Sequence, residues 1–355
     1  MNLRAILAGG GTGGHVIPAL AIAAELRSHF RAEVKFIGTA RGMEMRLVPR
    51  AGYELKLVEV GALKNVSFAT RAQTLFDLPR AIWRAGRYIS DFRAGVVIGV
   101  GGYASGPAMI AAAALGVPTV AFEPNVVPGF ANRRLAPVLG AACVQFEESC
   151  RHFGNCFVTG IPVRQEFFNV SPRPEGAPPT LLVFGGSQGA RRINEVVLES
   201  ISALGDAIPN LVIIHQTGER DYESAQTVYL HSKLRAEVSP FIDNMPEAFA
   251  RADLLLCRSG ASTVAEIMAA GKPAVLVPFP QAADDHQMRN AQAVARMNAG
   301  VIIRQAELTP ETLVTTVAGL LPDRARMQAM GRAARQHAHP HAARDIARIA
   351  ARMSR

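Results

Sequence analysis

The chain has 355 residues, of which 49% are hydrophobic and 19% are charged. This balance is typical of a soluble α/β protein, and the length favours two domains that each bury their own core. The 38 Lys and Arg residues exceed the 29 Asp and Glu residues by nine, which indicates an anionic partner: a nucleic acid, anionic lipid headgroups or a phosphorylated substrate.

No segment of the sequence is typical of a signal peptide or a membrane span. The apolar run at 3–8 is too short for a signal-peptide core. The longest apolar stretch, 108–122, is split by Gly116 and Pro118 and is too short to cross a bilayer. We therefore expect the chain to stay in the cytoplasm.

The first half of the chain alternates strand and helix patterns. An apolar strand at 3–8 breaks into the glycine-rich run 9–14, and a helix pattern follows over 17–29. Further strands are expected at 34–37, 96–100, 119–122 and 142–145. Because strands that alternate with helices pair in parallel, this order predicts a doubly wound parallel sheet.

The second half repeats the design of the first. Strands are expected at 181–184, 211–215, 237–239, 253–257 and 274–278, with glycine-containing turns after the first and fourth of them, at 185–189 and 259–260. We therefore predict two Rossmann-like domains that face a cleft, with room for a nucleotide-linked donor on one side and an acceptor on the other.

The border between the halves has two candidate positions. Residues 156–164 are expected to form the last strand of the first domain and the start of the crossing. Residues 169–180 contain four prolines, which makes them the strongest linker candidate in the chain.

The cysteines and a histidine cluster are not spaced as metal ligands. Cys143, Cys150, Cys156 and Cys257 form no C-x-x-C pair, so we expect reduced thiols rather than a zinc site or disulfides. Pro340 interrupts the helical register between His337 and His341, which favours a helix junction there.

The glycine run after the first strand matches G-x-G-x-x-G, the dinucleotide fingerprint. That fingerprint also needs an acidic residue after the second strand, where this chain has Gly38-Thr39-Ala40-Arg41. An NAD-dependent oxidoreductase is therefore disfavoured, although the backbone N–H groups still offer a pyrophosphate site. His15, at the mouth of this loop, is a candidate base or phosphate donor, with a purely structural role as the equal alternative.

A second glycine loop follows the strand at 96–100. We expect it to receive the acceptor, although tight strand–helix packing would explain one or two of its glycines. Its candidate residues are Gly101, Gly102, Tyr103, Ser105 and Gly106.

In the second half, the helix that begins after Ser259-Gly260 offers first-turn N–H groups to a diphosphate. Glu266, about one turn inside, could accept hydrogen bonds from two ribose hydroxyls, or could merely complement the helix dipole. No D-x-D segment is present, so no essential metal is indicated.

A basic–apolar segment, residues 62–93, carries six Lys and Arg against two Asp. It also contains Phe76, Ile82 and the only Trp, Trp83, which would enter a membrane interface. Anionic headgroups would meet the cations of this segment: Lys64, Arg71, Arg80, Arg84 and Arg87. The alternative, an ordinary helix that buries this apolar face in the core, is equally open.

Five motifs, at 10–15, 101–107, 185–190, 258–266 and 277–291, occur in an order that resembles the MurG family. These are the UDP-N-acetylglucosamine:undecaprenyl-pyrophosphoryl-muramoyl-pentapeptide N-acetylglucosaminyltransferases of peptidoglycan synthesis. The resemblance covers essentially the whole chain and implies a GT-B fold. It implies an N-terminal acceptor- and membrane-facing domain at 1–162, joined by a final helix at about 341–355, and a UDP-sugar-binding domain at 163–340.

The resemblance also implies a site for UDP-GlcNAc, with the backbone of Ile242 on uracil, Ser187 and 261–265 on the diphosphate, Glu266 on ribose, and Gln287 with Asn125 on the sugar. The family usually has His-Glu-Gln-Asn where this chain has Phe122-Glu123-Pro124-Asn125, and Pro124 removes an amide and an N–H. The implied donor set is Thr12, Gly13, Gly14, Asn125, Arg164, Ser187, Ile242, Ala261, Ser262, Thr263, Val264, Ala265, Glu266 and Gln287.

The expected reaction is inverting transfer of GlcNAc to the C4 hydroxyl of undecaprenyl-pyrophosphoryl-MurNAc-pentapeptide, without a metal cofactor. Expected partners are these two substrates and an anionic membrane surface, with other cell-wall and division proteins as further candidates. Another GT-B enzyme, such as a lipid sugar transferase or a UDP-sugar 2-epimerase, is the nearest alternative. A nucleic-acid binder is disfavoured because the basic residues come with apolar clusters.

Overall fold

The computed structural model describes residues 3–60, 68–171, 173–174, 176–186 and 189–354, with the backbone alone for 68–76. By its internal contacts the chain divides into two compact units. The first unit contains Met1–Pro162 and His341–Arg355, and the second contains Val163–Pro340.

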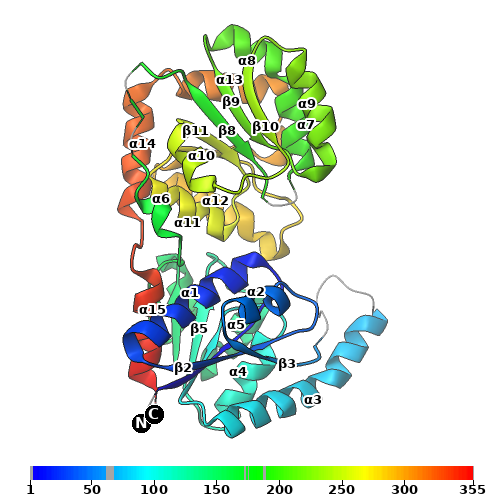
Figure 1. Ribbon diagram of the computed structural model, residues 1–355, viewed down its shortest axis with the longest axis vertical. Helices are drawn as coiled ribbons and strands as arrows, with labels where there is room; N and C mark the ends of the chain where they lie inside the picture. Colours follow the sequence, from blue (N-terminus) through cyan, green and yellow to red (C-terminus); the bar gives the residue numbers. More distant parts are fainter. Residues whose placement is uncertain (1–2, 61–67, 172, 175, 187–188, 355) are drawn as a thin grey trace. The chain divides into compact units, whose positions relative to one another are not determined.

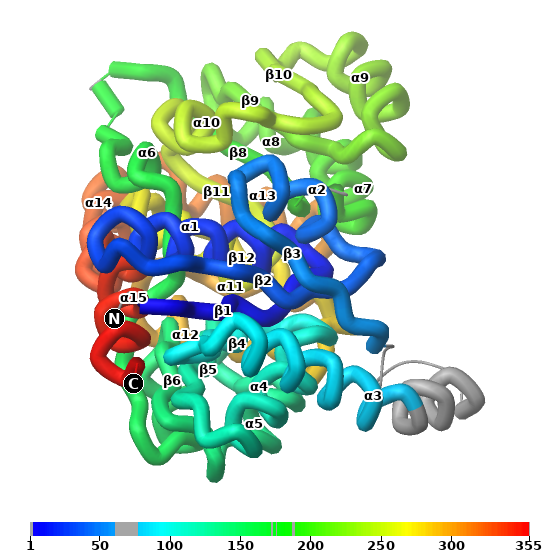
Figure 2. Tube along the Cα trace, turned by 60° about the horizontal axis from the view of Figure 1, so that its bottom comes forward, coloured from blue at the N-terminus to red at the C-terminus, as the bar shows by residue number. Residues whose placement is uncertain are grey.

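The first unit is built on a seven-stranded parallel sheet in the order β3-β2-β1-β4-β5-β6-β7. Figure 2 labels the strands from β3 to β6 in this order. The central strands are apolar and buried on both faces, as expected of a parallel sheet covered by helices. The strands are β1 (Arg4–Ala8), β2 (Glu33–Gly38), β3 (Glu54–Leu57), β4 (Val96–Gly99), β5 (Thr119–Glu123), β6 (Ala141–Val144) and β7 (Cys156–Val158).

Helices connect these strands and bury apolar faces against the sheet. In the long helix α3, Ala81, Ala85, Ile89 and Phe92 recur at helical spacing and join one core cluster with α4 and the sheet. The helices of this unit are α1 (Gly13–Phe30), α2 (Glu44–Arg50), α3 (Phe68–Phe92), α4 (Ser105–Ala114), α5 (Phe130–Leu135) and α15 (Ala342–Met353).

The second unit contains a six-stranded parallel sheet in the order β10-β9-β8-β11-β12-β13. Its strands are β8 (Thr180–Phe184), β9 (Val212–Gln216), β10 (Arg235–Ser239), β11 (Leu254–Cys257), β12 (Ala274–Leu276) and β13 (Gly300–Ile302). Its helices are α6 (Gln165–Phe168), α7 (Arg191–Glu199), α8 (Ile201–Ala207), α9 (Tyr222–Leu230), α10 (Met245–Arg251), α11 (Ala261–Ala270), α12 (His286–Arg296), α13 (Pro310–Leu320) and α14 (Arg324–Gln336).

The four glycine motifs all follow the two central strands of a sheet. In each sheet the strand order reverses between two neighbours, β1 and β4 in the first and β8 and β11 in the second. Ligands of open α/β sheets bind outside the carboxyl ends of the strands at such a switch point. The repeated sequence pattern therefore marks the same topological position in both units.

The last helix, α15, packs beside α1 and β4 of the first unit although it is far from them in sequence (Figure 1). Ala342, Ile346, Ala347 and Ala350 form its buried stripe. The break between α14 and α15 spans 337–341, which confirms the expected helix junction.

The proline-rich segment 169–180 is not the border between the units, which contradicts its prediction as the linker. The border lies at Pro162 and Val163. The segment is attached to the second unit instead: the Arg335 guanidinium donates to the carbonyl of Val170 (3.1 Å), and Arg173 forms an ion pair with Asp253 (3.3 Å). The described part of this segment therefore belongs to the second unit.

The expectation of reduced cysteines was wrong for one pair. Cys150 and Cys156 form a disulfide, with their Cα atoms 5.4 Å apart. A short 3-10 helix, Glu147–His152, turns the chain back so that Cys150 faces the start of β7. The other two, Cys143 and Cys257, are free and buried, and burial raises the pKa of the Cys143 thiol to about 12.

Candidate active site

The two glycine loops of the first unit are in backbone contact. The Gly10 N–H donates to the carbonyl of Gly101 (3.2 Å). Gly102 has a φ of +80°, and a Cβ there would overlap the Gly10 carbonyl. Only glycine permits both this conformation and this approach, so the loops after β1 and β4 form one continuous surface.

His15 lies where these loops meet, in the first turn of α1. Its Nδ1 is 3.1 Å from the carbonyl of Gly10, and its ring packs against Gly101. Because a carbonyl only accepts, Nδ1 carries the proton and Nε2 keeps a lone pair. Burial lowers the pKa of His15, against a weaker opposing effect of the Gly10 hydrogen bond and the Glu44 charge. The ring is therefore a neutral imidazole at pH 7, with Nε2 as its basic atom.

The N-terminus of α1 leaves free backbone N–H groups at three residues that the family resemblance assigns to UDP-GlcNAc. His15 and Val16 donate to the carbonyl of Thr12, and the Thr12 side chain does not cap the helix. The N–H groups of Thr12, Gly13 and Gly14 precede the first helical hydrogen bond and have no carbonyl in the helix to bind. They remain available to an anion.

The acceptor loop presents its members differently. Tyr103 is 54% exposed, whereas Ser105 is buried at the start of α4. The Ser105 hydroxyl lies 2.7 Å from the place where a Cβ on Gly99 would be. Its side chain therefore points into the unit, and Ser105 can serve an acceptor only through its backbone.

Asn125 is held by a buried carboxylate at the end of β5. Glu123 accepts the backbone N–H groups of Asn125 (3.0 Å) and Gly129 (2.8 Å) and the side-chain amides of Asn125 (3.2 Å) and Asn132 (2.9 Å). Burial raises the pKa of Glu123, opposed by these four hydrogen bonds. The hydrogen bonds of Glu123 thus hold the turn that contains Pro124.

The second unit has a pocket of about 620 Å³ beyond the carboxyl ends of β8, β11 and β12. It combines glycine turns, three arginines and two phenylalanines. Thr263 and Gln287 are the predicted donor residues that line it. The lining residues are Phe184, Gly185, Gly186, Gly189, Ala190, Arg191, Arg192, Glu195, Arg258, Gly260, Thr263, Phe279, Gln287 and Gln305.

The start of α11 offers a narrower set of donors than predicted. The N–H of Val264 already donates to the carbonyl of Gly260 (2.9 Å), and the side chains of Val264 and Ala265 are buried. The free first-turn N–H groups are therefore those of 261–263, that is Ala261, Ser262 and Thr263.

Gln287 is fixed beside this helix. Its side-chain oxygen accepts the N–H of Phe279 (3.0 Å), and its carbonyl accepts the Ser259 hydroxyl (2.8 Å). The amide nitrogen of Gln287 is thereby the end of the side chain left for a ligand in the pocket.

Glu266 is half-buried in the middle of α11, outside its first turn. Burial raises the pKa of Glu266 to about 7, opposed by the charge of Arg164. Arg164 stands at the start of α6, 5.2 Å above the ring of Phe167. The position within the helix disfavours a role in complementing the helix dipole, because that effect is confined to the first turn.

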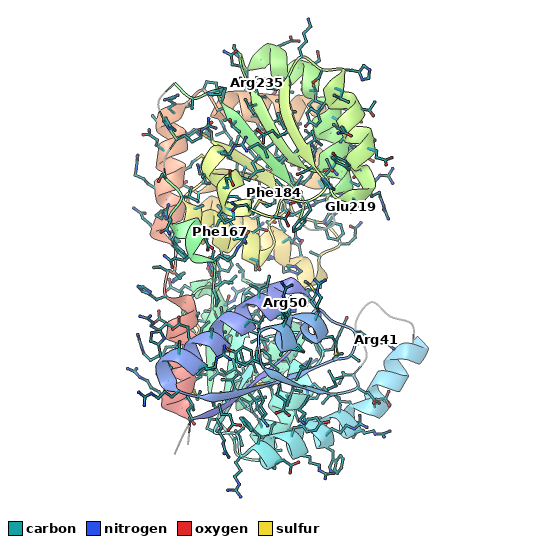
Figure 3. All side chains as sticks on the ribbon, in the orientation of Figure 1. Arg41, Arg50, Phe167, Phe184, Glu219 and Arg235 are labelled. Carbon is teal, nitrogen blue, oxygen red and sulfur yellow. A yellow bond between two sulfur atoms is a disulfide. The ribbon has the colours of Figure 1, made fainter. Side chains whose placement is uncertain are left out.

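A residue of α6, Phe167, belongs to an aromatic cluster. The rings of Phe167 and Phe184, both labelled in Figure 3, each pack against Phe249, at centroid distances of 5.0 and 5.7 Å. Phe184 ends β8 and also lines the pocket. This cluster therefore joins the base of the pocket to the helix that carries Arg164.

Of the two backbone groups of Ile242 that were predicted to contact uracil, one is already bonded. Its N–H donates to the side-chain oxygen of Gln216 (3.2 Å), whose amide nitrogen donates to Gly186 (2.8 Å). Only the Ile242 carbonyl is left for uracil. Ser187, the other predicted contact of the diphosphate, lies outside the described residues.

Arg258 is a pocket residue for which no role was predicted, although it begins the motif at 258–266. Its guanidinium donates to the carbonyls of Val277 (3.1 Å) and Pro278 (3.3 Å) and to Gln305 (2.7 Å). Burial lowers the pKa of Arg258 to about 10, so it stays cationic at pH 7. A cation directly after a buried strand and before Ser-Gly was the available signal.

Within the described ranges, no group of three or more His, Cys, Asp or Glu side chains is placed to hold a metal ion. The anion-binding groups found here are instead helix N-termini and arginines. Such groups can stabilise a diphosphate electrostatically.

Two family models match the chain. Residues 5–143 match the glycosyltransferase family 28 N-terminal domain, and residues 180–346 match the glycosyltransferase family 28 C-terminal domain. Among curated proteins, the UDP-N-acetylglucosamine–N-acetylmuramyl-(pentapeptide) pyrophosphoryl-undecaprenol N-acetylglucosamine transferase of Solibacter usitatus is 46% identical, over 99% of this chain and 96% of that protein. The proteins of the same name from Myxococcus xanthus and Geobacter metallireducens are 42% and 40% identical, over 98% and 97% of this chain and 92% and 97% of their own.

Solved structures agree with these relatives. The crystal structure of Acinetobacter baumannii MurG has a TM-score of 0.84 and 34% identity, with 99% of both chains covered. A UDP-GlcNAc 2-epimerase from Neisseria meningitidis has a TM-score of 0.67 at 14% identity, with 98% of both chains covered, a likeness of fold alone. The predicted GT-B fold is confirmed, and the chain belongs to glycosyltransferase family 28 and, within it, to the MurG family of N-acetylglucosamine transferases.

Proposed function

We propose that this chain transfers GlcNAc from UDP-GlcNAc to the C4 hydroxyl of undecaprenyl-pyrophosphoryl-MurNAc-pentapeptide, the step that completes the lipid-linked disaccharide of peptidoglycan. The observation that carries the proposal is the 40–46% identity, over nearly the whole chain, to transferases whose name gives this donor and this lipid-linked acceptor. Cell-wall biogenesis, cell shape and cell division would depend on this step, with other cell-wall and division proteins as candidate partners.

Several groups of the second unit suit a UDP-sugar. The free N–H groups at the start of α11 and the Arg258 guanidinium would bind the diphosphate, and Glu266 would accept the ribose hydroxyls. The amide nitrogen of Gln287 would contact the sugar. As UDP departs, the charge that develops on its diphosphate would be stabilised by these fixed donors.

The first unit supplies a candidate base. Nε2 of His15 would take the proton of the C4 hydroxyl while the oxygen attacks the anomeric carbon. The bond from that carbon to the UDP oxygen breaks, with inversion, and UDP leaves with the electron pair. The N–H groups of Thr12, Gly13 and Gly14, which the family resemblance assigns to UDP-GlcNAc, would instead hold the acceptor's pyrophosphate, because they border His15 in the first unit.

The direct test is an assay with radiolabelled UDP-GlcNAc and a lipid-pyrophosphate-linked MurNAc-peptide. We expect label to enter the lipid fraction only when both substrates are present. A parallel sample with UDP-GlcNAc alone, followed by NMR of the sugar, tests the epimerase alternative. Conversion to the 2-epimer without lipid labelling would refute the proposal.

Binding of UDP-GlcNAc should depend on pH through Glu266. The carboxylate of the free protein has a pKa of about 7, and ribose hydroxyls donate to its ionised form, so donor binding is linked to loss of a proton. Affinity should therefore rise with pH, to about tenfold tighter at pH 8 than at pH 6. Calorimetry at both pH values measures this, and Glu266→Gln should bind weakly with no such dependence. Equal affinity of the native protein at both values would contradict the assignment.

We further propose that the first unit binds the cytoplasmic face of the cell (inner) membrane as a peripheral protein. Among the described helices, none is both long and apolar enough to cross a membrane. Helix α3 has one face in the core and one face that suits membrane docking. Ala81, Ala85 and Ile89 are buried, whereas Trp83 is 64% exposed and the Arg87 guanidinium lies 5.8 Å from the centre of its ring.

Some residues of the basic–apolar segment fit the core-helix interpretation, and others fit the membrane-interface interpretation. Ile82 packs against the core cluster rather than facing outward, because it borders the buried stripe. Arg80 is exposed, and Arg84 forms an ion pair with Glu59 (3.0 Å). The side chains of Phe76 and Arg71, and the whole of Lys64, lie outside the described residues.

Removing the exposed Trp and its neighbouring cation should weaken membrane binding. Loss of one basic residue near an anionic surface costs about 1 kcal/mol, so Trp83→Ser/Arg87→Ser should bind vesicles at least about fivefold more weakly. Sedimentation with vesicles of increasing anionic lipid content measures this. Leu230→Ser, which removes a 77% exposed apolar side chain from the second unit, is the matched control. Equal binding by all three proteins would argue for the core-helix interpretation.

A further inference from the structure

Glu44, the first residue of α2, has a carboxylate that is almost completely buried beside the first glycine loop. Its Oε2 accepts the N–H of Gly11 (2.6 Å). Its Oε1 accepts both the N–H (3.0 Å) and the hydroxyl (2.9 Å) of Thr39. The Gly11 N–H of this glycine loop therefore already binds a carboxylate of the protein itself.

Three glycines make room for this carboxylate. A Cβ on Gly10 or Gly42 would overlap the carboxylate group, and one on Gly38 would lie 2.7 Å from the Glu44 Cγ. Gly10 lies in the loop after β1, whereas Gly38, the last residue of β2, and Gly42 flank the turn between β2 and α2. Their shared function is to let the chain close around one charged group.

The peptide group that binds Glu44 is the same one that binds His15. In the peptide between Gly10 and Gly11, the N–H points to Glu44 and the carbonyl accepts from Nδ1 of His15. The two groups of a trans peptide point in opposite directions, so fixing one fixes the other. An ionised acceptor on the N–H also strengthens the carbonyl as an acceptor.

We propose that Glu44 is a positioning residue that acts on His15 through the Gly10–Gly11 peptide, holding its proton on Nδ1 and its lone pair on Nε2. The proposal rests on the proposed role of His15 as the base. The carboxylate orients the imidazole as the Asp of a Ser-His-Asp triad does, with one peptide group between them. Without it, this peptide group loses the acceptor of its N–H, since the hydrogen bonds of the Gly10 N–H and the Gly11 carbonyl belong to the neighbouring peptide groups. A flip would meet no side chain of the loop, because residues 9–11 are all glycines with positive φ.

The charge of Glu44 fits this role. Burial by itself would raise its pKa, but the hydrogen bonds from Gly11 and Thr39 outweigh burial and lower the pKa of Glu44, so it is ionised at pH 7. The groups around the His15 ring are the Gly10 carbonyl, the Thr12 hydroxyl (3.4 Å) and the Gly101 backbone. Among the described residues, Glu44 is the charged group that raises the pKa of His15.

The test combines two variants with two measurements. Glu44→Gln keeps the size but lacks the second acceptor and the charge, and Glu44→Asp keeps the charge but withdraws it from Gly11. In ¹⁵N-histidine-labelled protein without substrate, we expect a single Nδ1–H tautomer of His15 in the native chain and a tautomer mixture in both variants. We also expect kcat to fall about 10- to 100-fold, the usual effect of an orienting partner, with the UDP-GlcNAc Kd unchanged.

Glu54→Gln is the control, because Glu54 forms ion pairs with Lys35 and Lys56 away from the loop. If either folded variant keeps the tautomer and the kcat of the native chain, the proposal is wrong. A lower melting temperature with an unchanged tautomer would assign Glu44 a structural role only, and would overturn it as well. If the native chain transfers no GlcNAc, the proposed function fails, while the tautomer measurement still decides the link between Glu44 and His15.

Discussion

Replacing His15 by alanine is expected to lower kcat about 10²–10⁴-fold, the usual contribution of a general base. The imidazole is held neutral by burial, with Nδ1 on the Gly10 carbonyl and Nε2 available. The UDP-GlcNAc affinity should not change, since the groups assigned to the nucleotide belong to the second unit. Steady-state kinetics with both substrates varied, together with calorimetry of the donor, separate these effects.

His29→Ala is the matched control for this measurement. His29 is in the last turn of the same helix, where it is exposed and paired with Glu25 (2.9 Å), so its loss should leave kcat unchanged. If His15→Ala changes kcat by less than about threefold and raises only the acceptor KM, His15 is a phosphate ligand and the base lies elsewhere.

Replacing Glu266 by alanine is expected to weaken UDP-GlcNAc binding by about 2–3 kcal/mol, or roughly 30- to 150-fold, because a charged acceptor of two ribose hydroxyls is lost. The fold should persist, since the removed carboxylate is itself destabilised by burial: its pKa is raised to about 7. Calorimetry with UDP and with UDP-GlcNAc should give the same loss, because both ligands carry the ribose.

Glu223→Ala tests the dipole alternative. Glu223 is an exposed acid in the first turn of α9, where a carboxylate does complement the helix dipole. Its removal should cost a few tenths of a kcal/mol of stability and leave UDP binding intact. Unchanged UDP affinity in Glu266→Ala would remove this residue from the site.

Membership of the MurG family and the geometry of the site support different parts of the proposal. Family membership supports the identity of both substrates, which no pocket by itself would specify. The geometry adds what a name does not contain: which N–H groups are free, which are already bonded, and which nitrogen of His15 has the lone pair.

The sequence determined much of this protein by local pattern. Apolar runs followed by glycine turns marked β1, β4, β8 and β11, and apolar runs alone marked several other strands, because a buried parallel strand needs a continuous apolar segment. The short strands β3 and β13 escaped notice because each has only three or four residues and β3 has two charged side chains. The repetition of the glycine motifs in both halves was enough to predict two Rossmann-like domains.

Only the tertiary structure decided how the site residues are used. Glu44 and Gly11 are 33 residues apart, and no sequence pattern indicates that the Gly11 N–H donates to the Glu44 carboxylate. The same holds for the N–H of Ile242, taken by Gln216, and for the Cys150–Cys156 disulfide. A motif records which donors and acceptors a segment carries, but whether each is free depends on groups that the fold brings next to it from elsewhere in the chain.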